Sequence, residues 1–308
     1  MKKTYEEVEV THLSNGEKVT FGVHKYKGAA EGPIVGISGA VHGDELIGAE
    51  IIRRVAKELE NYELKGQVWL IPIVNQLAFE NVTRNTPLDM NNLNRVFPGD
   101  EKGWITDQLA FKFTKEILEK IDAFIDIHAG GKIPIVDYVY IHNDEGLSKA
   151  FLSPYLYRPA ISYEGTTATV TTQLNIPSVT IEIGGGPNYE KDIKRGVEGI
   201  INQLVYLKVI EGEVKTVENQ VVLTEIASIR PTQGGMLVPA FDFSYVNKVI
   251  EGPQTIAEIY NPKTFELLET IKAPFEKNVM ILMRGYVGTV NSGDYGWMLG
   301  NMESKEND

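Results

Sequence analysis

The sequence has 308 residues, of which 43% are hydrophobic and 23% charged, so it has the composition of a globular protein with one large domain or a main domain and a small one. Its formal net charge of -12 argues against nucleic acid or an anionic membrane as the main partner. It contains no cysteine, which excludes disulfides, thiolate metal sites and a cysteine nucleophile.

The N-terminal residues are charged and include no apolar segment, which argues against a secretory signal. No apolar run approaches the length of a membrane span. We therefore expect a cytoplasmic protein without a membrane partner, and a homo-oligomer remains open.

The first two thirds of the chain alternate short apolar segments with amphipathic ones. Apolar runs predict strands at 33–38, 67–74, 123–127, 138–142 and 178–183. Helical spacing of apolar residues predicts helices over 47–60, 109–121 and 190–209, the second capped by Thr106. This alternation predicts an α/β fold with a mixed, mostly parallel sheet flanked by helices.

Beyond about residue 215 the pattern changes to short β-rich runs broken by glycine and proline. These runs lie at 221–223, 235–238, 248–250 and 279–283, and no helix of convincing length remains. We therefore predict a main α/β domain over residues 1–218 and a small β-rich C-terminal domain over residues 219–308.

Three possible metal ligands follow the ends of predicted strands. His42 and Glu45 lie three residues apart after the first of these strands, and His128 closes the strand at 123–127. Ligands gather at the carboxyl ends of strands in open parallel sheets, and two imidazoles with one carboxylate are typical of a catalytic zinc site. Asp126 shares the strand face of His128 and is a candidate to orient it. Each residue alone is more often structural, so the prediction depends on their joint placement.

The remaining histidines and the serines carry weaker signals. His12 and His24 are expected to be structural, whereas His142 ends another strand and is a minor site candidate. Ser38 is the only serine near a strand end, but its flanking residues do not match G-x-S-x-G. Serine hydrolysis is therefore disfavoured.

Glu182 is the best candidate for a general base. It lies in the apolar strand Val179–Ile183, where a carboxylate either faces solvent on an edge or is buried for a purpose. Burial would raise its pKa toward the range that a base needs at neutral pH. The glycines at 184–186 are expected to let a substrate approach the backbone closely.

A long polar loop after the second of these strands carries the other candidates. Asn94 and Arg95 could anchor a substrate carboxylate, since arginine binds this group bidentately, and Arg84 could polarise the scissile carbonyl. The alternative is a surface loop with ordinary exposed arginines.

Together, these residues resemble the succinylglutamate desuccinylase/aspartoacylase branch of the zinc carboxypeptidase clan. The matching motifs are His42–Glu45 (HGDE), Asn94–Gly99 (NRVFPG), Asp126–His128 (DIH) and Ile181–Gly184 (IEIG), and the resemblance extends over nearly the whole chain. It implies a carboxypeptidase-like fold with one Zn²⁺ per chain, a general base, an oxyanion contact and a carboxylate-binding pair. The corresponding positions here are His42, Glu45 and His128 for zinc. Glu182 corresponds to the general base, Arg84 to the oxyanion contact, and Asn94 with Arg95 to the carboxylate-binding pair.

The resemblance implies hydrolysis of the amide bond of a small N-acyl amino acid, of acetyl or succinyl type, to a carboxylic acid and an amino acid. Arg158 and Lys132 are candidates by position only for binding a second carboxylate. The residues after His128 carry no hydroxyl group, which disfavours recognition of peptides. The alternatives are a zinc carboxypeptidase acting on short peptides and a non-catalytic binding protein on the same scaffold.

Overall fold

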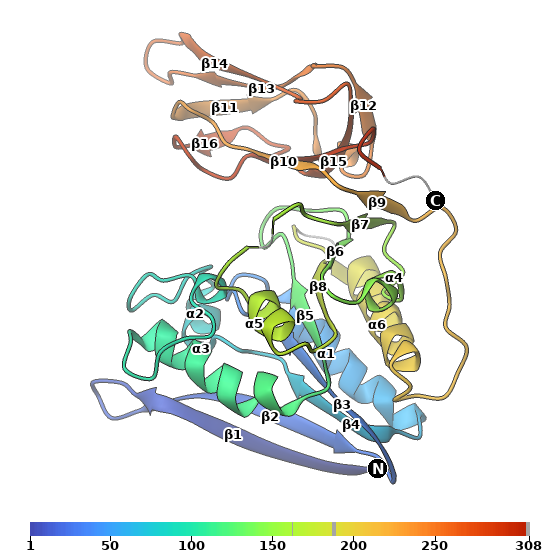
Figure 1. Ribbon diagram of the computed structural model, residues 1–308. Coiled ribbons are helices and arrows are strands. Elements are labelled where there is room, and N and C mark those ends of the chain that lie inside the picture. Colours follow the sequence, from blue (N-terminus) through green and yellow to red (C-terminus); the bar gives the residue numbers. More distant parts are fainter. Residues whose placement is uncertain (162, 187–188, 306–308) are drawn as a thin grey trace.

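The computed structural model describes residues 1–161, 163–186 and 189–305. Its main element is a sheet of nine strands: β1 (Lys2–His12), β2 (Lys18–Lys27), β3 (Ala30–Gly39), β4 (Lys65–Ile71), β5 (Ala123–His128), β6 (Tyr138–Ile141), β7 (Tyr155–Tyr157), β8 (Ser178–Glu182) and β9 (Val221–Leu223). They are ordered β1-β2-β4-β3-β5-β8-β6-β7-β9 (Figure 1). The pairs within β4-β3-β5-β8 and β6-β7-β9 are parallel and the other three pairs are antiparallel. The predicted mixed, mostly parallel sheet is confirmed.

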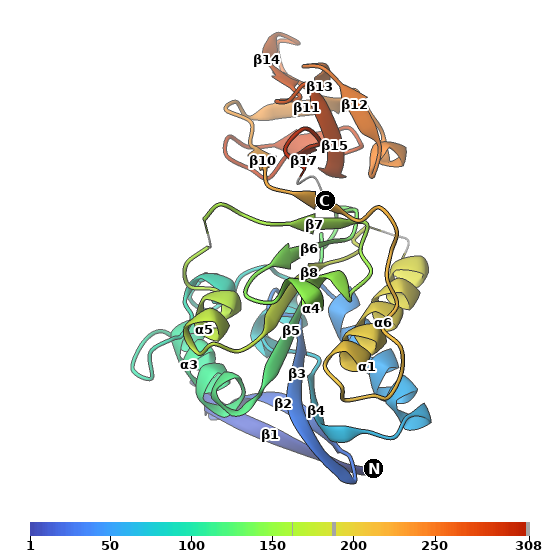
Figure 2. The ribbon, with the colours of Figure 1, turned by 45° about the vertical axis from the view of Figure 1, so that its right-hand side comes forward.

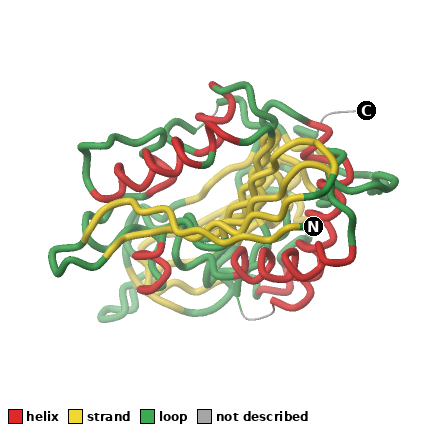
Figure 3. The backbone as a smooth tube through the Cα atoms, turned by 90° about the horizontal axis from the view of Figure 1, so that it is seen from below, coloured by secondary structure: helices red, strands yellow, loops and turns green. Residues whose placement is uncertain are grey.

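Helices cover both faces of this sheet (Figure 3). On one face, α1 (Ile47–Glu58), α4 (Glu145–Lys149) and α6 (Tyr189–Tyr206) pack in one apolar cluster with side chains from β3 and β5. A second cluster contains residues of α3 (Ile105–Glu116) and α5 (Thr167–Gln173). The short helices are α2 (Gln76–Asn81), η1 (Leu59–Asn61), η2 (Leu93–Arg95) and η3 (Leu118–Lys120). Among the described residues, no helix is both long and apolar enough to cross a bilayer.

Two details of the predicted elements are wrong. The helix predicted to be capped by Thr106 begins at Ile105, and the Asp107 carboxylate accepts a hydrogen bond of 2.9 Å from the backbone N–H of Trp104. Thr106 instead donates its hydroxyl to Asp89, at 2.7 Å. The predicted strand over 67–74 ends at Ile71, and the polar segment after it folds into α2 and η2.

The C-terminal part forms two antiparallel sheets (Figure 2). They enclose their own core, which includes the buried Trp297. The first contains β10 (Ile226–Ile229), β17 (Trp297–Asn301), β15 (Lys277–Leu282) and β12 (Val249–Glu251), in that order. The second contains β14 (Leu267–Lys272), β13 (Thr255–Tyr260), β11 (Gly235–Pro239) and β16 (Gly288–Val290), and the 3-10 turn η4 (Phe243–Tyr245) follows β11 in the chain. The strand β9 follows residue 218 in the chain but belongs to the large sheet. The predicted division into two domains after residue 218 stays a prediction.

Candidate active site

The candidate site lies where the strand order of the large sheet reverses. β3 is flanked by β4 on one side and by β5 on the other, so the chain leaves β3 in one direction and returns to its opposite side. Such a reversal opens a crevice beyond the carboxyl ends of the strands. The loop after β3 packs tightly there, since a Cβ atom on Gly43 would lie 2.0 Å from the carbonyl carbon of Ala78. Glycine at this position lets the loop rest directly on α2.

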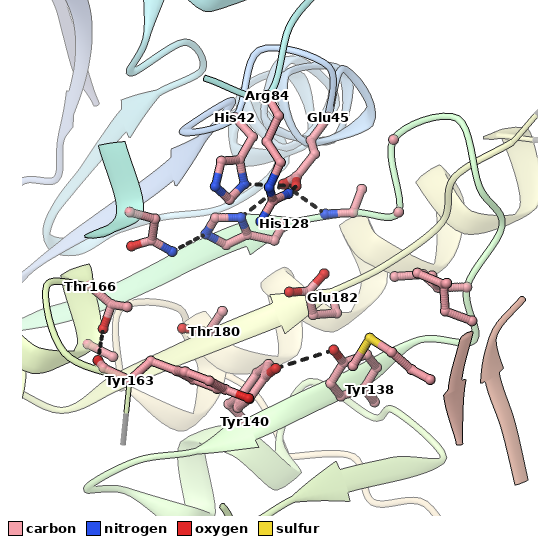
Figure 4. A pocket seen from close by; sticks show the side chains of 18 of the residues that line it. His42, Glu45, Arg84, His128, Tyr138, Tyr140, Tyr163, Thr166, Thr180 and Glu182 are labelled. Atoms are coloured by element: carbon pink, nitrogen blue, oxygen red, sulfur yellow. Dashed lines mark hydrogen bonds and ion pairs between the residues drawn. The ribbon is translucent and has the colours of Figure 1, made fainter. Parts of the chain in front are cut away.

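His42, Glu45 and His128 meet in this crevice (Figure 4). Nδ1 of His42 lies 2.8 Å from Oε1 of Glu45, and Nδ1 of His128 lies 2.9 Å from Oε2. One ligand atom from each of the three residues lies within 4.8 Å of the other two, and all three side chains are at most 3% exposed. The structure thus brings together the three residues that the sequence predicts as ligands, and this group could hold a metal ion.

The outer ring nitrogens of both histidines have their own partners. Nε2 of His42 lies 3.0 Å from Oδ1 of Asn92, and Nε2 of His128 lies 3.2 Å from Oδ2 of Asp126. Asp126 is buried and also accepts hydrogen bonds from the hydroxyls of Ser38 and Thr167. With a cation bound, the oxygen acceptors at Nε2 would keep a proton there and leave the Nδ1 lone pair for the metal, the arrangement typical of metal-binding histidines. The donor set therefore fits a divalent cation.

The charges of this group are strongly coupled. Burial disfavours a protonated His128, but the negative charges of Asp126 and Glu45 outweigh burial and raise its pKa well above the ordinary value. Burial likewise acts to raise the pKa of Glu45, but the two histidines outweigh it and hold that pKa well below its usual range. Without a metal, the group therefore keeps a proton that a bound cation would replace.

Glu182 ends β8 next to this group. The parallel register places it beside His128 of β5, and the antiparallel register places it beside Tyr138 of β6. Figure 4 shows its carboxylate on the cavity side of β8, below His128. Burial raises the pKa of Glu182 to about 8, although the nearby His128 charge opposes this shift. Such a carboxyl group can exchange protons near neutral pH.

The glycines after Glu182 have a different role from the one expected. Gly184 accepts a hydrogen bond from the N–H of Gly130 and Gly186 donates one to Gly131, both at 3.1 Å. A Cβ atom on Gly185 would lie 2.2 Å from the carbonyl oxygen of Ile133. This run therefore packs the end of β8 against the loop after β5, and it is Gly130 and Gly131 that line the cavity.

Arg84, Asn94 and Arg95 belong to the long segment between β4 and α3. A guanidinium nitrogen of Arg84 donates to Oε1 of Glu45 at 3.0 Å. Oδ1 of Asn94 accepts from the backbone N–H of Thr167 at 3.1 Å, which points its Nδ2 to within 3.3 Å of His128. Arg95 is exposed at the rim, where its guanidinium lies over the ring of Tyr163. All three predicted residues line the same cavity as Glu182.

This cavity has a volume of about 500 Å³, and several of its residues were not predicted from sequence. Tyr138 and Tyr140 lie two residues apart on β6. His142, the weaker candidate, follows directly after the end of β6, and its Nε2 lies 2.9 Å from the hydroxyl of Thr180. Aromatic residues at a spacing of two on a strand were the signal available for them. The threonines of α5 that line the cavity had no such signal, and neither had Asn92, which contacts His42 but does not line the cavity.

The other sequence candidates lie elsewhere. Arg158 pairs with Glu145 at 2.9 Å, and the cavity lining includes neither Arg158 nor Lys132. His12 and His24 lie on the strands β1 and β2, outside the cavity.

Comparison with known proteins finds relatives of this chain. Residues 31–207 match the model of the succinylglutamate desuccinylase/aspartoacylase catalytic domain. The N-alpha-acetyl-L-2,4-diaminobutyric acid deacetylase of Halomonas elongata is 27% identical, over 86% of this chain and 81% of that protein.

Solved structures share the fold over nearly the whole chain. A succinylglutamate desuccinylase from Silicibacter sp. TM1040 has a TM-score of 0.83 and 23% identity, covering 99% of this chain and 95% of that one. The product-bound ectoine utilization protein EutE (DoeB) of Ruegeria pomeroyi has a TM-score of 0.84 and 23% identity, covering 97% and 95%. With more than half of its residues matched by the family model, this chain belongs to the succinylglutamate desuccinylase/aspartoacylase family.

Proposed function

We propose that this protein is a zinc-dependent deacylase that hydrolyses the amide bond of a small N-acyl amino acid. The observation that supports this most is the strand register that sets Glu182 directly beside His128 in one cavity with His42 and Glu45. A buried cation site next to a carboxyl group of raised pKa is the pairing that amide hydrolysis needs. The name of the Halomonas relative, a deacetylase of an acylated amino acid, points the same way.

In this proposal, His42, Glu45 and His128 hold one Zn²⁺, which as a Lewis acid polarises the carbonyl and lowers the pKa of water. Arg95 and Asn94 bind the α-carboxylate of the substrate at the cavity rim. A guanidinium nitrogen of Arg84 donates to Glu45, one of the proposed zinc ligands, so Arg84 lies next to the metal site. From this position it can donate to the carbonyl oxygen of the substrate as negative charge develops on that oxygen.

Glu182 moves the proton. It takes a proton from the attacking water as the water oxygen bonds to the acyl carbon, and then gives this proton to the leaving nitrogen as the C–N bond breaks. The remaining water proton passes from the new carboxylic acid to the amine, so the products are a carboxylate and an amino acid with a protonated amine.

Amine release from a panel of acetyl and succinyl amino acids and dipeptides tests this proposal. We expect the zinc-loaded protein to release amine from N-acyl amino acids, and the metal-stripped protein to release none. Release from dipeptides alone would instead assign a carboxypeptidase. A zinc-loaded protein that turns over neither class would support the non-catalytic alternative.

Asn92→Ala is expected to weaken zinc binding by about 10- to 100-fold, because Asn92 fixes the Nε2 side of His42. Titration against a competing chelator measures this affinity. Asn91→Ala, at the neighbouring position of the same loop, is the matched control and should leave the affinity unchanged. Equal affinities for Asn92→Ala and the unaltered protein would remove Asn92 from the site.

We expect kcat/KM to rise with pH, because Glu182 acts in its deprotonated form. Its pKa of about 8 refers to a cavity without a cation, and a bound cation lowers that value toward the ordinary 4.5. The inflection should therefore lie between these limits, with activity lost as pH falls through it. A profile that is flat across the whole interval would contradict this role.

A further inference from the structure

The two ends of the cavity differ in chemistry. Figure 4 shows Tyr163, Thr166 and Thr180 on one side of Glu182 and Tyr138 on the other. On the first side the lining continues with hydroxyl-bearing residues of α5. On the second side it includes five residues that share one hydrophobic cluster and that we call the apolar lobe: Ile133, Ile135, Tyr138, Leu282 and Met298. Ser228, the cross-strand neighbour of Met298, adds a hydroxyl group to this side, and no lysine or arginine belongs to the lobe.

The apolar lobe is built jointly by the two parts of the chain. Ile133 and Ile135 belong to the loop between β5 and β6, whereas Leu282 belongs to β15 and Met298 to β17. Ile135 and Leu282 form a β-bridge, and the N–H of Val136 donates to the carbonyl of Ile281 at 2.9 Å. These backbone contacts hold the two walls of the lobe in register.

The carboxylate-binding pair lies at the polar end. Asn94 is fixed by the N–H of Thr167, at the start of α5, and the guanidinium of Arg95 lies 5.5 Å from the centre of the Tyr163 ring. In an N-acyl amino acid, the carboxylate and the acyl chain extend in opposite directions from the amide. With the carboxylate at Arg95 and the amide beside Glu182, the acyl chain extends toward Tyr138.

We propose that the apolar lobe is the acyl subsite and that it accepts short, uncharged acyl groups and rejects acyl groups that carry a carboxylate. This inference rests on the proposed deacylase function and makes Leu282 and Met298 of the β-rich part determinants of specificity. Each methylene buried in the lobe should improve binding by about fourfold until the lobe is full. An ionised carboxylate buried there without a cationic partner should weaken binding by at least about 100-fold.

Binding to zinc-loaded Glu182→Gln tests the subsite separately from turnover. Calorimetry would compare acetyl, propionyl, succinyl and 4-methylpentanoyl derivatives of alanine and of 2,4-diaminobutyrate. The 4-methylpentanoyl group has the outline of succinyl without its charge, and we expect it to bind at least about 100-fold more tightly. Equal or tighter binding of the succinyl compound, or no binding in either series, would overturn the proposal.

Met298→Lys provides the second arm, because it adds a cation to the lobe at a half-buried position. We expect its preference for 4-methylpentanoyl over succinyl to fall at least 10-fold. Met302→Lys is the matched control, since Met302 packs on the same cluster but does not line the cavity. An unchanged preference in Met298→Lys, or an equal change in Met302→Lys, would overturn the assignment.

Turnover by the protein with Glu182 intact separates the two proposals. If this protein hydrolyses none of these compounds while the Glu182→Gln variant binds them in the expected order, the acyl subsite stands and the deacylase function fails. If they are hydrolysed and the succinyl compound is preferred, the deacylase function stands and the acyl subsite is wrong.

Discussion

Glu182→Gln should lower kcat/KM for the best N-acyl amino acid by about 100- to 10,000-fold, the range in which general acid–base catalysis contributes. The amide has nearly the shape of the carboxylate, so the strand pairing with His128 and Tyr138 should persist. In the proposed mechanism, the variant loses the group that takes a proton from water and gives it to the leaving nitrogen. Initial rates of amine release, with zinc content measured on the same samples, provide the test.

Two measurements give this result its meaning. Glu198 is an exposed residue of α6 whose carboxylate pairs with Lys215, and Glu198→Gln should keep full activity. Zinc content should be equal in Glu182→Gln and in the unaltered protein, because Glu182 is not one of the proposed ligands. A Glu182→Gln variant with full zinc and a loss below about tenfold would show that another group carries the proton.

The candidate metal group could be predicted because its three residues share one placement, directly at or after the ends of predicted strands. His42, Glu45 and His128 follow apolar segments whose helical connections imply parallel strands, and parallel strands bring their carboxyl ends to one edge. Glu182 followed from the same reasoning, as a carboxylate inside an apolar strand. The candidate residues predicted in this way lie at the ends of strands or in the loop directly after one.

The residues that the sequence could not place depend on contacts between distant segments. Asn92 reaches His42 only because the long loop folds into η2 over the crevice. Leu282 and Met298 lie at the cavity because the β-bridge between Ile135 and Leu282 joins the β-rich part to the loop after β5. No periodicity in the sequence encodes this bridge. The strand β1 was missed because most of its side chains are exposed, so it lacks a continuous apolar face.

Glu45→Ala should destabilise the metal-free protein by about 3 kcal/mol, because it leaves a buried positive charge with one partner fewer. The Glu45 carboxylate lies against Nδ1 of both histidines and accepts from the N–H of Ala129 at 3.1 Å. The same change removes a proposed ligand, so zinc binding should be lost as well. Urea unfolding of chelator-treated protein gives the change in free energy.

This loss of stability should depend on pH in a defined way. The lowered pKa of Glu45 contributes stability that is present above its ordinary value of 4.5 and is lost as the pH falls. The raised pKa of His128 contributes stability that is complete below its ordinary value of 6.5 and is lost as the pH rises through the raised value. The effect of Glu45→Ala should therefore be greatest between pH 4.5 and 6.5 and smaller at pH 9.

Glu50→Ala is the control. It removes a carboxylate that is more exposed than that of Glu45 and that pairs with Arg53 and Arg54, so it should cost less than about 1 kcal/mol. Equal costs for the two variants at pH 5.5 would mean that the buried pair adds no stability, and that Glu45 is kept for the metal alone.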